Sequence, residues 1–339
     1  MDDEGRRLDR VLRKSCPQIP ISAIYRLLRQ GEITLNGKAA LASARIKAGD
    51  LIQFTGRSPD FFGGNKTQSK IDKGVPDAAP AYGKDIKITF KEKRESLYKN
   101  LPSPKLDILF ENKDILVLNK STGTLCHGEK SLASSVEAYL EHRIPCSLSF
   151  KPGPLHRLDR ETSGLLLFSK SLSGARYISY GLHEGLFHKN YLAIVEGIIK
   201  EEELWEDRLL RDKDLKTTFV NPQDSSTAKQ AVSMIRRLAV SPSCSFVRVE
   251  IKTGRTHQIR SQAAYHNHPL LGDTKYSTHT PQKSGGSQFF LHSHCIEFPP
   301  DNPLCLPQKI TAPLPKIFEK KIASLFGFTN ADRFLLESC

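Results

Sequence analysis

The chain has 339 residues, 38% of them hydrophobic, which is enough for two or three domains with buried cores. Lys and Arg number 50 against 37 Asp and Glu, and the net charge of +13 favours a polyanionic partner, most often nucleic acid. The seven scattered cysteines contain no Cys-x-x-Cys pair and no apolar run approaches the roughly 18 residues of a membrane span, which argues against a zinc ribbon, a disulfide framework and a membrane protein.

The first 55 residues predict a small separate unit. They open on MDDEGRRLDR, which is too polar for a signal peptide and fits a cytoplasmic protein. Ser22 is a candidate N-cap for a helix over AIYRLLRQ, and Gly31 ends its apolar pattern. The pair Asn36-Gly37 predicts a two-residue hairpin turn, and a further strand is expected over 51–54.

Basic side chains decorate this unit, namely Arg26, Arg29, Lys38 and Arg45. A solvated charged face is the ordinary interpretation of such scatter, but the overall charge favours phosphate contacts. The stretches RLDRVLRK, ISAIYRLLRQGEITLNGK and IKAGDLIQF resemble the RNA-binding module that a small-subunit ribosomal protein shares with tyrosyl-tRNA synthetases. The resemblance covers roughly residues 6–55 and implies an RNA-binding unit, and the overall charge predicts RNA contacts for these four residues.

Residues 56–104 differ in composition from what precedes them. The segment SPDFFGGNKTQSKIDKGVPDAAPAYGKD is rich in Gly, Pro, Ser and Lys and poor in aliphatic residues. Too little apolar surface is available there to offset the entropy of ordering, so we expect a linker, with a short strand over 85–90.

Residues 105–320 predict a globular domain, followed by a carboxy-terminal extension over 321–339. Strands are expected over 106–110, 114–120, 165–168, 191–195 and 247–251, and helices over 131–142 and 172–185. Because regular helices do not separate these strands, we expect an α+β fold with a mixed, mainly antiparallel sheet.

The segment HRLDRETSG places Asp159 between Arg157 and Arg160. A surface ion pair is the ordinary interpretation of an isolated Arg-x-Asp. Nearby positive charge also favours an ionised carboxylate, however, and an ionised carboxylate can serve as a nucleophile or a base.

Two further polar blocks are candidates to meet Asp159. In TGRTHQIR, Thr256 can cap a helix that carries Arg260 near its first turns. In KNYLAIVEG, Tyr191 begins a predicted strand.

The blocks HRLDRETSGLLLFSKS, KNYLAIVEG, IKTGRTHQIR with HPLLGDTKY, and LHSHCIEF occur in the order found in RluA-type pseudouridine synthases, which residues 105–316 resemble. The preceding DILFENKDILVLNKSTGTLCH resembles the strand pair that opens that domain. The resemblance implies that Asp159 is the catalytic aspartate and that Arg260 pairs with it. It also implies that Tyr191 stacks beside the target uracil and takes part in proton removal, and that Arg157 fills the gap left in the RNA stack.

The implied reaction breaks the bond from ribose to the uracil nitrogen, turns the base and rejoins ribose to uracil carbon 5. No atoms enter or leave, so neither a cofactor nor a metal is expected. The reaction requires an ionised carboxylate kept from water and a base flipped out of its stack, which costs a few kcal/mol. Sugar attack, ring attack and removal of the sugar's carbon-2 proton all stay open for Asp159.

Three positions depart from the family pattern, which usually has proline at Ser121, histidine at Gln262 and glycine at Asn267. The last two lie beside the helix predicted to carry Arg260, so the departures bear on how that helix is positioned.

Other functions have weaker support. There is neither a GxSxG elbow nor a Walker loop, and the pairs His266/His268 and His292/His294 lack further ligands at metal spacing. LFSKS resembles a synthetase KMSKS loop but lacks the leading lysine. The serious alternatives are a synthase that acts on transfer RNA and a catalytically inactive RNA-binding or ribosome-assembly factor. The order of the two modules favours large-subunit ribosomal RNA, and a monomer is expected.

Overall fold

The computed structural model describes residues 3–17, 19–47, 49–55, 106–128, 130–141, 143–144, 147, 150–212, 214–220, 227–277 and 288–327. The predicted linker and its strand over 85–90 lie outside these residues. The chain divides into two compact units, Met1–Pro102 with His142–Lys151, and Ser103–Glu141 with Pro152–Cys339. Among the described residues, no helix is both long enough and apolar enough to cross a membrane.

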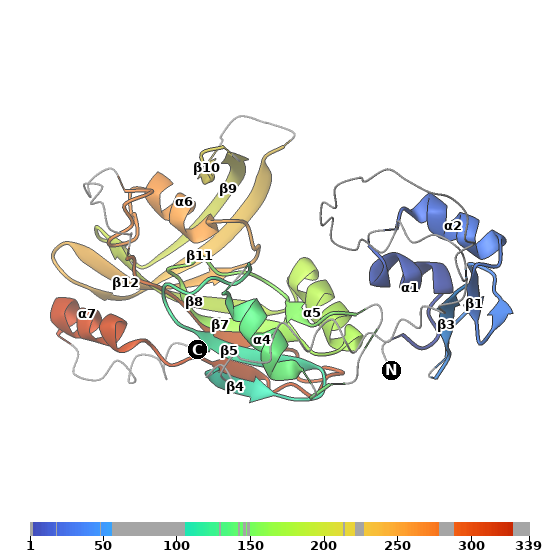
Figure 1. The fold of residues 1–339 in the computed structure, drawn as a ribbon. Helices are drawn as coiled ribbons and strands as arrows, with labels where there is room; N and C mark the ends of the chain where they lie inside the picture. The colour runs from blue at the N-terminus through green and yellow to red at the C-terminus, as the bar shows by residue number, and fades with distance from the viewer. Residues whose placement is uncertain are drawn as a thin grey trace, which may run out of the picture. The chain divides into compact units, whose positions relative to one another are not determined.

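The amino-terminal unit packs two helices against a small antiparallel sheet (Figure 1). Its elements are α1 (Leu8–Ser15), α2 (Ile21–Arg29), β1 (Ile33–Leu35), β2 (Lys38–Ala39) and β3 (Ile52–Phe54), with strand order β2-β1-β3. Buried apolar side chains from both helices and β1 form its core, among them Leu8, Leu12, Ile24 and Ile33.

The turn predicted from the residue types of this unit is present in the structure, but the predicted N-cap is not. Asn36 and Gly37 both have positive φ, as the predicted two-residue turn requires. The prediction of Ser22 as N-cap is wrong, because α2 begins at Ile21 and the carbonyl of Pro20 accepts the N–H groups of Ala23 and Ile24. The first helical turn therefore closes on the proline carbonyl, two residues earlier than a side-chain cap at position 22 would allow.

The second unit is built on one large mixed sheet. Its strands are β4 (Ile108–Glu111), β5 (Ile115–Lys120), β6 (Gly153–Pro154), β7 (Ser163–Ser169), β8 (His188–Glu196), β9 (Glu202–Asp212), β10 (Thr217–Val220), β11 (Lys229–Val240), β12 (Cys244–Ile251), β13 (Leu291–Glu297) and β14 (Lys309–Thr311). The order is β10-β9-β11-β12-β8-β13-β7-β5-β4, with β14 beside β13 and β6 beside β7. Among the described strands only β7 and β13 pair in parallel, so the predicted mixed, mainly antiparallel sheet is confirmed.

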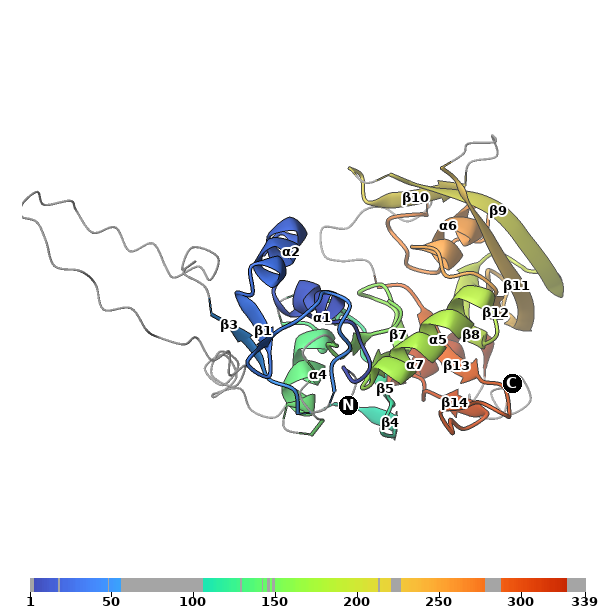
Figure 2. The same ribbon diagram turned by 90° about the vertical axis from the view of Figure 1, so that its right-hand side faces the viewer.

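The described part of this unit holds four helices, α4 (Leu132–Leu140), α5 (Leu172–Glu184), α6 (Gln258–Tyr265) and α7 (Lys316–Phe326). Leu165 and Leu167 of β7 pack with Ile178 of α5, and Figures 1 and 2 both show α5 beside β7. The other cluster joins Leu192 of β8 to Phe318 of α7. α7 continues past the predicted domain boundary at residue 320.

Strand β8 positions the tyrosine of the candidate site. Tyr191 lies in its middle rather than at its start, because His188–Asn190 also pair with β12 and β13. Since successive side chains of a strand point to opposite faces, Tyr191 faces away from the Leu192 and α7 side of the sheet.

Candidate active site

A buried lysine holds the loop that carries Asp159, between β6 and β7. The amine of Lys120 donates to the carbonyl oxygens of Ser121, Thr124 and Arg160 at 2.9, 2.9 and 2.8 Å. These three acceptors offset part of the cost of burying a charge, although burial still lowers the pKa of Lys120 to about 8. The peptide next to Asp159 is thereby tied to the end of β5.

The two arginines that flank Asp159 in the sequence form no ion pair with it among the described residues. Arg160 directs its Nε to the carbonyl of Gly123 at 3.0 Å, and its side chain is 67% exposed. Arg157 is exposed and lines the same pocket as Asp159. The arginine that does bind Asp159 comes from elsewhere in the chain.

Arg260 of α6 lies between two carboxylates. Its Nη1 donates to Asp159 at 3.0 Å, and its Nε and Nη2 donate to the fully buried Asp273 at 2.7 and 2.9 Å. Phe289 covers the guanidinium at 4.3 Å. Burial lowers the pKa of Arg260, but Asp273 and Asp159 outweigh this and raise it. A permanent cation is therefore fixed against the Asp159 carboxylate, whose side chain is 16% exposed.

His257 provides a second polar neighbour of Asp159. It is the N-cap residue of α6 with φ 53°, so the prediction that Thr256 caps this helix is wrong. A left-handed backbone at His257 turns the chain into the helix without a side-chain cap. Its Nε2 lies 3.6 Å from the Asp159 carboxylate, and burial above all lowers the pKa of His257 to about 4, so the ring is neutral near pH 7.

The hydrogen bonds around His257 indicate which nitrogen carries its proton. The backbone N–H of Thr218 donates to the Tyr276 hydroxyl oxygen at 2.8 Å, and that hydroxyl lies 2.7 Å from His257 Nδ1. The neutral tautomer with its proton on Nε2 satisfies both neighbours of the ring, because Tyr276 can then donate to Nδ1 while Nε2–H faces the Asp159 carboxylate. The Nε2–H therefore points its positive end towards Asp159.

Tyr191 forms an apolar wall of the same pocket. Burial raises its pKa to about 12, although a hydrogen bond with Ser293 acts in the opposite direction. The structure thus brings the four predicted residues, which come from three sequence blocks, into one pocket: Arg157, Asp159, Tyr191 and Arg260. Ile251, Arg255 and His257 also line it.

A glycine allows the strands beneath this pocket to approach closely. Gly164, five residues after Asp159, has φ 105° and pairs with Ser293 across the parallel β7–β13 contact. A Cβ atom at this position would overlap the Ser293 carbonyl. Both its φ and this contact require glycine.

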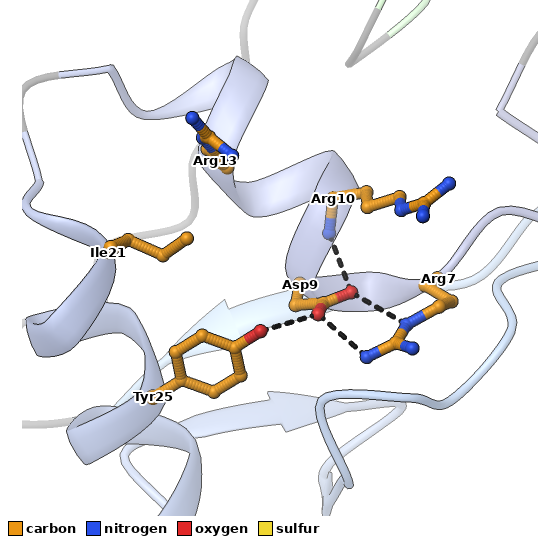
Figure 3. Close-up of a pocket in the computed structure, with 6 residues that line it drawn as sticks. All are labelled: Arg7, Asp9, Arg10, Arg13, Ile21 and Tyr25. Carbon is orange, nitrogen blue, oxygen red and sulfur yellow. Dashed lines mark hydrogen bonds and ion pairs between the residues drawn. The ribbon is translucent and has the colours of Figure 1, made fainter.

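The basic residues predicted to bind RNA in the amino-terminal unit are all exposed: Arg26, Arg29, Lys38 and Arg45. Arg45 also donates to the Gly5 carbonyl at 2.6 Å. The structure adds a hollow in this unit, lined by Arg7, Asp9, Arg10, Arg13, Ile21 and Tyr25 (Figure 3).

Asp9 organises this hollow. It accepts hydrogen bonds from both Nε and Nη2 of Arg7, at 3.1 and 2.9 Å, and from the Tyr25 hydroxyl at 2.8 Å. The backbone N–H of Arg10 adds a fourth donor. The guanidinium groups of Arg10 and Arg13 have no partner among the described residues. Two unpaired cations therefore border the hollow.

Sequence reasoning missed four residues that build the active-site candidate, namely Lys120, His257, Asp273 and Tyr276. All lie inside quoted blocks, in NKSTG, GRTHQIR and GDTKY. The spacing between blocks is not readable from the residues, and Lys275, two residues after Asp273, is a nearer cation in the sequence than Arg260.

The departures from the family pattern are accommodated in the structure. Gln262 is fully buried, accepts from Ser233 at 2.7 Å and donates to Asp207 at 2.7 Å. Asn267 has φ 65°, a conformation that Asn tolerates better than most residues. Neither replacement disturbs the helix that carries Arg260.

No metal site emerges from the described residues, in which no group of three or more His, Cys, Asp or Glu side chains is arranged to hold an ion. His292 instead contacts Ser163 and Ala312, and His294 also contacts Ala312. These two histidines serve the packing of β13.

Two family models match the chain. Residues 114–265 match the model described as RNA pseudouridylate synthase, and residues 6–52 match the S4 domain. The "Ribosomal large subunit pseudouridine synthase C" of Vibrio vulnificus is 30% identical over 96% of this chain and 94% of its own length. The protein of the same name from Escherichia coli K12 is 28% identical over 88% of this chain and 86% of its own length.

Solved structures share the fold of the second unit. "Human RNA Pseudouridylate Synthase Domain Containing 1" aligns with a TM-score of 0.53 and 20% identity over 70% of this chain and 96% of its own. "Human RNA Pseudouridylate Synthase Domain Containing 4" aligns with a TM-score of 0.52 and 22% identity over 63% of this chain and 91% of its own.

Proposed function

Because this chain belongs to the RNA pseudouridylate synthase family, we propose that it isomerises uridines of large-subunit ribosomal RNA, with Asp159 as the reacting carboxylate. The chain is an RNA pseudouridine synthase, an isomerase, and its substrate is RNA. The choice of ribosomal RNA rests on the names of its relatives and on the S4 domain that precedes the synthase domain.

The main support for this role of Asp159 is the series of hydrogen bonds that links Asp273 to Arg260 and Arg260 to Asp159. The carboxylate must be ionised whether it attacks the sugar, attacks the ring or removes a proton. Arg260 donates a single charge-assisted hydrogen bond to Asp159, which lines the pocket. Asp273 holds Arg260, so the cation stays in place when charge on Asp159 changes.

Tyr191 acts, in this proposal, as a stacking wall and a proton relay. A phenol with a pKa near 12 keeps its proton at neutral pH, so it removes the uracil carbon-5 proton only if it passes its own proton on. The uracil nitrogen released from ribose is the acceptor that balances this exchange, and the hydrogen bond with Ser293, which lowers the pKa of Tyr191, stabilises the phenolate in between.

Arg157 occupies the place of the flipped base. It is exposed, lies two residues from Asp159 and has no side-chain partner among the described residues. A free guanidinium at the rim of the pocket can stack into a gap in RNA and offset part of the cost of unstacking.

The amino-terminal unit, residues 1–55, supplies affinity for RNA in this proposal. Its exposed Arg26, Arg29, Lys38 and Arg45, and the two unpaired arginines beside the hollow, suit contacts to phosphates. Since the substrate would be ribosomal RNA, we place the protein in the cytoplasm, and we propose that it acts as a monomer.

Chemical mapping of pseudouridines in total RNA tests this function. RNA from cells with and without the gene is compared, and the gene is restored as wild type or as Asp159→Ala. We expect defined large-subunit sites to lose pseudouridine and only the wild type to restore them. Loss confined to transfer RNA would move the target to that class, and unchanged maps would favour the inactive assembly factor.

A further inference from the structure

We infer that Lys189 and Arg255 together bind one phosphate of the RNA strand, beside the nucleotide that enters the Asp159 pocket. Neither residue is among the four active-site residues predicted from the sequence, Arg157, Asp159, Tyr191 and Arg260. The inference rests on the proposed RNA substrate and adds where its backbone passes.

Strand geometry places Lys189 on the side of the pocket. It precedes Tyr191 by two residues on β8, so both side chains point to the same face of the sheet. Across the ladder it pairs with Ile251, which lines the pocket. A Cβ atom added to Gly254 would lie 4.0 Å from the Lys189 amine, so the amine reaches the turn that carries Arg255.

Arg255 approaches the same place from the pocket rim. It is exposed and lines the pocket, and its Nε donates to the Gln230 carbonyl at 3.0 Å. Its backbone N–H donates to the Gln258 side chain at 3.0 Å, which fixes the turn before α6. The terminal nitrogens of the guanidinium therefore remain available for a ligand.

The carboxylates nearest in sequence and across the sheet are already engaged. Glu250 accepts from Lys252 and His188, on the alternate face of β12 from Ile251, and Asp159 is held by Arg260. Among the described residues the Lys189 amine has neither an ion pair nor a hydrogen bond. A mostly buried cation without a partner is uncommon in a folded protein.

The electrostatics of the free protein agree with a missing anion. Burial first, and then repulsion from Arg255, lower the pKa of Lys189 to about 8. Burial and repulsion from Lys189 lower the pKa of His156 to about 4. A phosphate between Lys189 and Arg255 would replace repulsion by attraction, and its two free oxygens match two cationic donors.

The first experiment measures binding of an unmodified large-subunit ribosomal RNA transcript over a range of salt concentrations. We expect Lys189→Gln and Arg255→Gln each to weaken binding roughly three- to tenfold. The double variant should lower the salt slope by about 0.7 to 0.9, the change for one phosphate. Lys252→Gln, which removes an exposed and paired cation one turn away, is the matched control and should bind like the wild type.

Two results would overturn the shared site. One is wild-type affinity for Arg255→Gln, an exposed substitution that leaves the core intact. The other is a double-variant slope change about twice as large, which would mean two separate phosphates.

The second experiment separates this inference from the proposed function. The rate at which a reactive ester acylates Lys189 is read by peptide mass spectrometry, with and without the transcript. We expect RNA to slow acylation of Lys189 about fivefold or more and to leave Lys252 unchanged, because a bound phosphate covers the amine. Protection of Lys189 without pseudouridine formation would contradict the proposed function and support the phosphate site. Pseudouridine formation without protection of Lys189 would support the function and contradict the phosphate site.

Discussion

The same tetrapeptide, Arg-Leu-Asp-Arg, occurs once in each unit, at 7–10 and at 157–160. In the amino-terminal copy Asp9 accepts four hydrogen bonds, three of them from Arg7 and Tyr25. In the second copy the Asp159 carboxylate accepts a single hydrogen bond from the described residues, donated by Arg260, 101 residues away. A carboxylate saturated by donors anchors structure, whereas one with free acceptor positions facing a pocket is available for chemistry.

The difference arises from what packs against each copy rather than from the four residues. The first copy enters α1, where a regular backbone lets Arg7 reach Asp9. The second lies in an irregular loop that Lys120 ties to β5. Local sequence sets which groups are present, and the tertiary neighbours decide which of them stay unsatisfied.

Neutralising Asp159 and Asp9 in separate variants should show the largest difference between the two copies of the tetrapeptide. We expect Asp159→Asn to reduce pseudouridine formation by roughly three orders of magnitude or more, because an amide cannot act as the charged group. RNA affinity should change by less than about twofold. Asp9→Asn should leave kcat at saturating RNA unchanged and lower the stability of its unit. A single-turnover assay and equilibrium binding check both, and an active Asp159→Asn enzyme would end the assignment.

Neutralising Asp273, the second carboxylate that binds Arg260, should have the next largest effect on stability and activity. Asp273→Asn leaves Arg260 with one charged partner in a buried place, and we expect a loss of about 3 kcal/mol in the free energy of unfolding. Because Arg260 is then free to shift against Asp159, kcat should fall about a hundredfold with KM nearly constant.

The control for Asp273→Asn is the partly exposed pair of Glu250 and Lys252. Glu250→Gln should cost about 1 kcal/mol or less. Urea unfolding and steady-state kinetics measure all variants, and equal costs for the two pairs would contradict the role given to Asp273.

Acid should destabilise the two units unequally. Burial above all lowers the pKa of His156 and His257 to about 4 and of His292 to about 3, and all three lie in the second unit. Between about pH 6.5 and pH 4 the unfolded chain binds protons that the folded unit does not, so its stability falls as pH falls. Each histidine contributes at most about 1.4 kcal/mol per pH unit to this loss in the free energy of unfolding.

The described residues of the first unit contain no histidine, since residues 1–102 have none and His142 lies outside the described ranges, and they lack this source of acid sensitivity. Trp205, the one tryptophan of the chain, reports unfolding of the second unit, while hydrogen exchange in α1 and α2 reports on the first. His292→Gln should reduce the pH dependence of the Trp205 transition. An identical pH response of both units would contradict the prediction.

The smallest effect is expected from substitutions of the arginines that line the hollow beside Asp9. Arg10→Gln combined with Arg13→Gln should weaken RNA binding about fivefold and flatten its salt dependence, with kcat at saturating RNA unchanged. Lys14→Gln, an exposed cation of the same helix that does not line the hollow, is the control. A larger loss from neutralising Arg26 and Arg29 would place the main RNA contact on α2 instead.

Periodicity and turn chemistry predicted much of the fold. The helix over 172–185 and the strands at 115–120 and 165–168 followed from apolar spacing, and the Asn36-Gly37 turn followed from its residue types. The long strands β9 and β11 escaped prediction because charged side chains alternate along them with only a few buried ones, such as Trp205 and Ala231. Their pairing with each other, not their hydrophobicity, makes them strands.

The site was less accessible from the residues than the fold. Charge around Asp159 in the sequence pointed to Arg157 and Arg160, while the structure uses Arg260 for the ion pair. Resemblance to a family linked the blocks. Only the folded chain reveals that Asp273 and His257 complete the surroundings of Asp159, because a contact over 101 or 13 residues leaves no periodic trace.

The contact of Gly164 with the Ser293 backbone carries a consequence for how this enzyme can change over time. Gly164 follows Asp159 by five residues, and Ser293 on the neighbouring strand is the hydrogen-bond partner of Tyr191. No side chain intervenes whose size could be adjusted. The spacing of β7 and β13 at this point is therefore set by main-chain contact, and substitutions among the surrounding side chains leave that spacing unchanged.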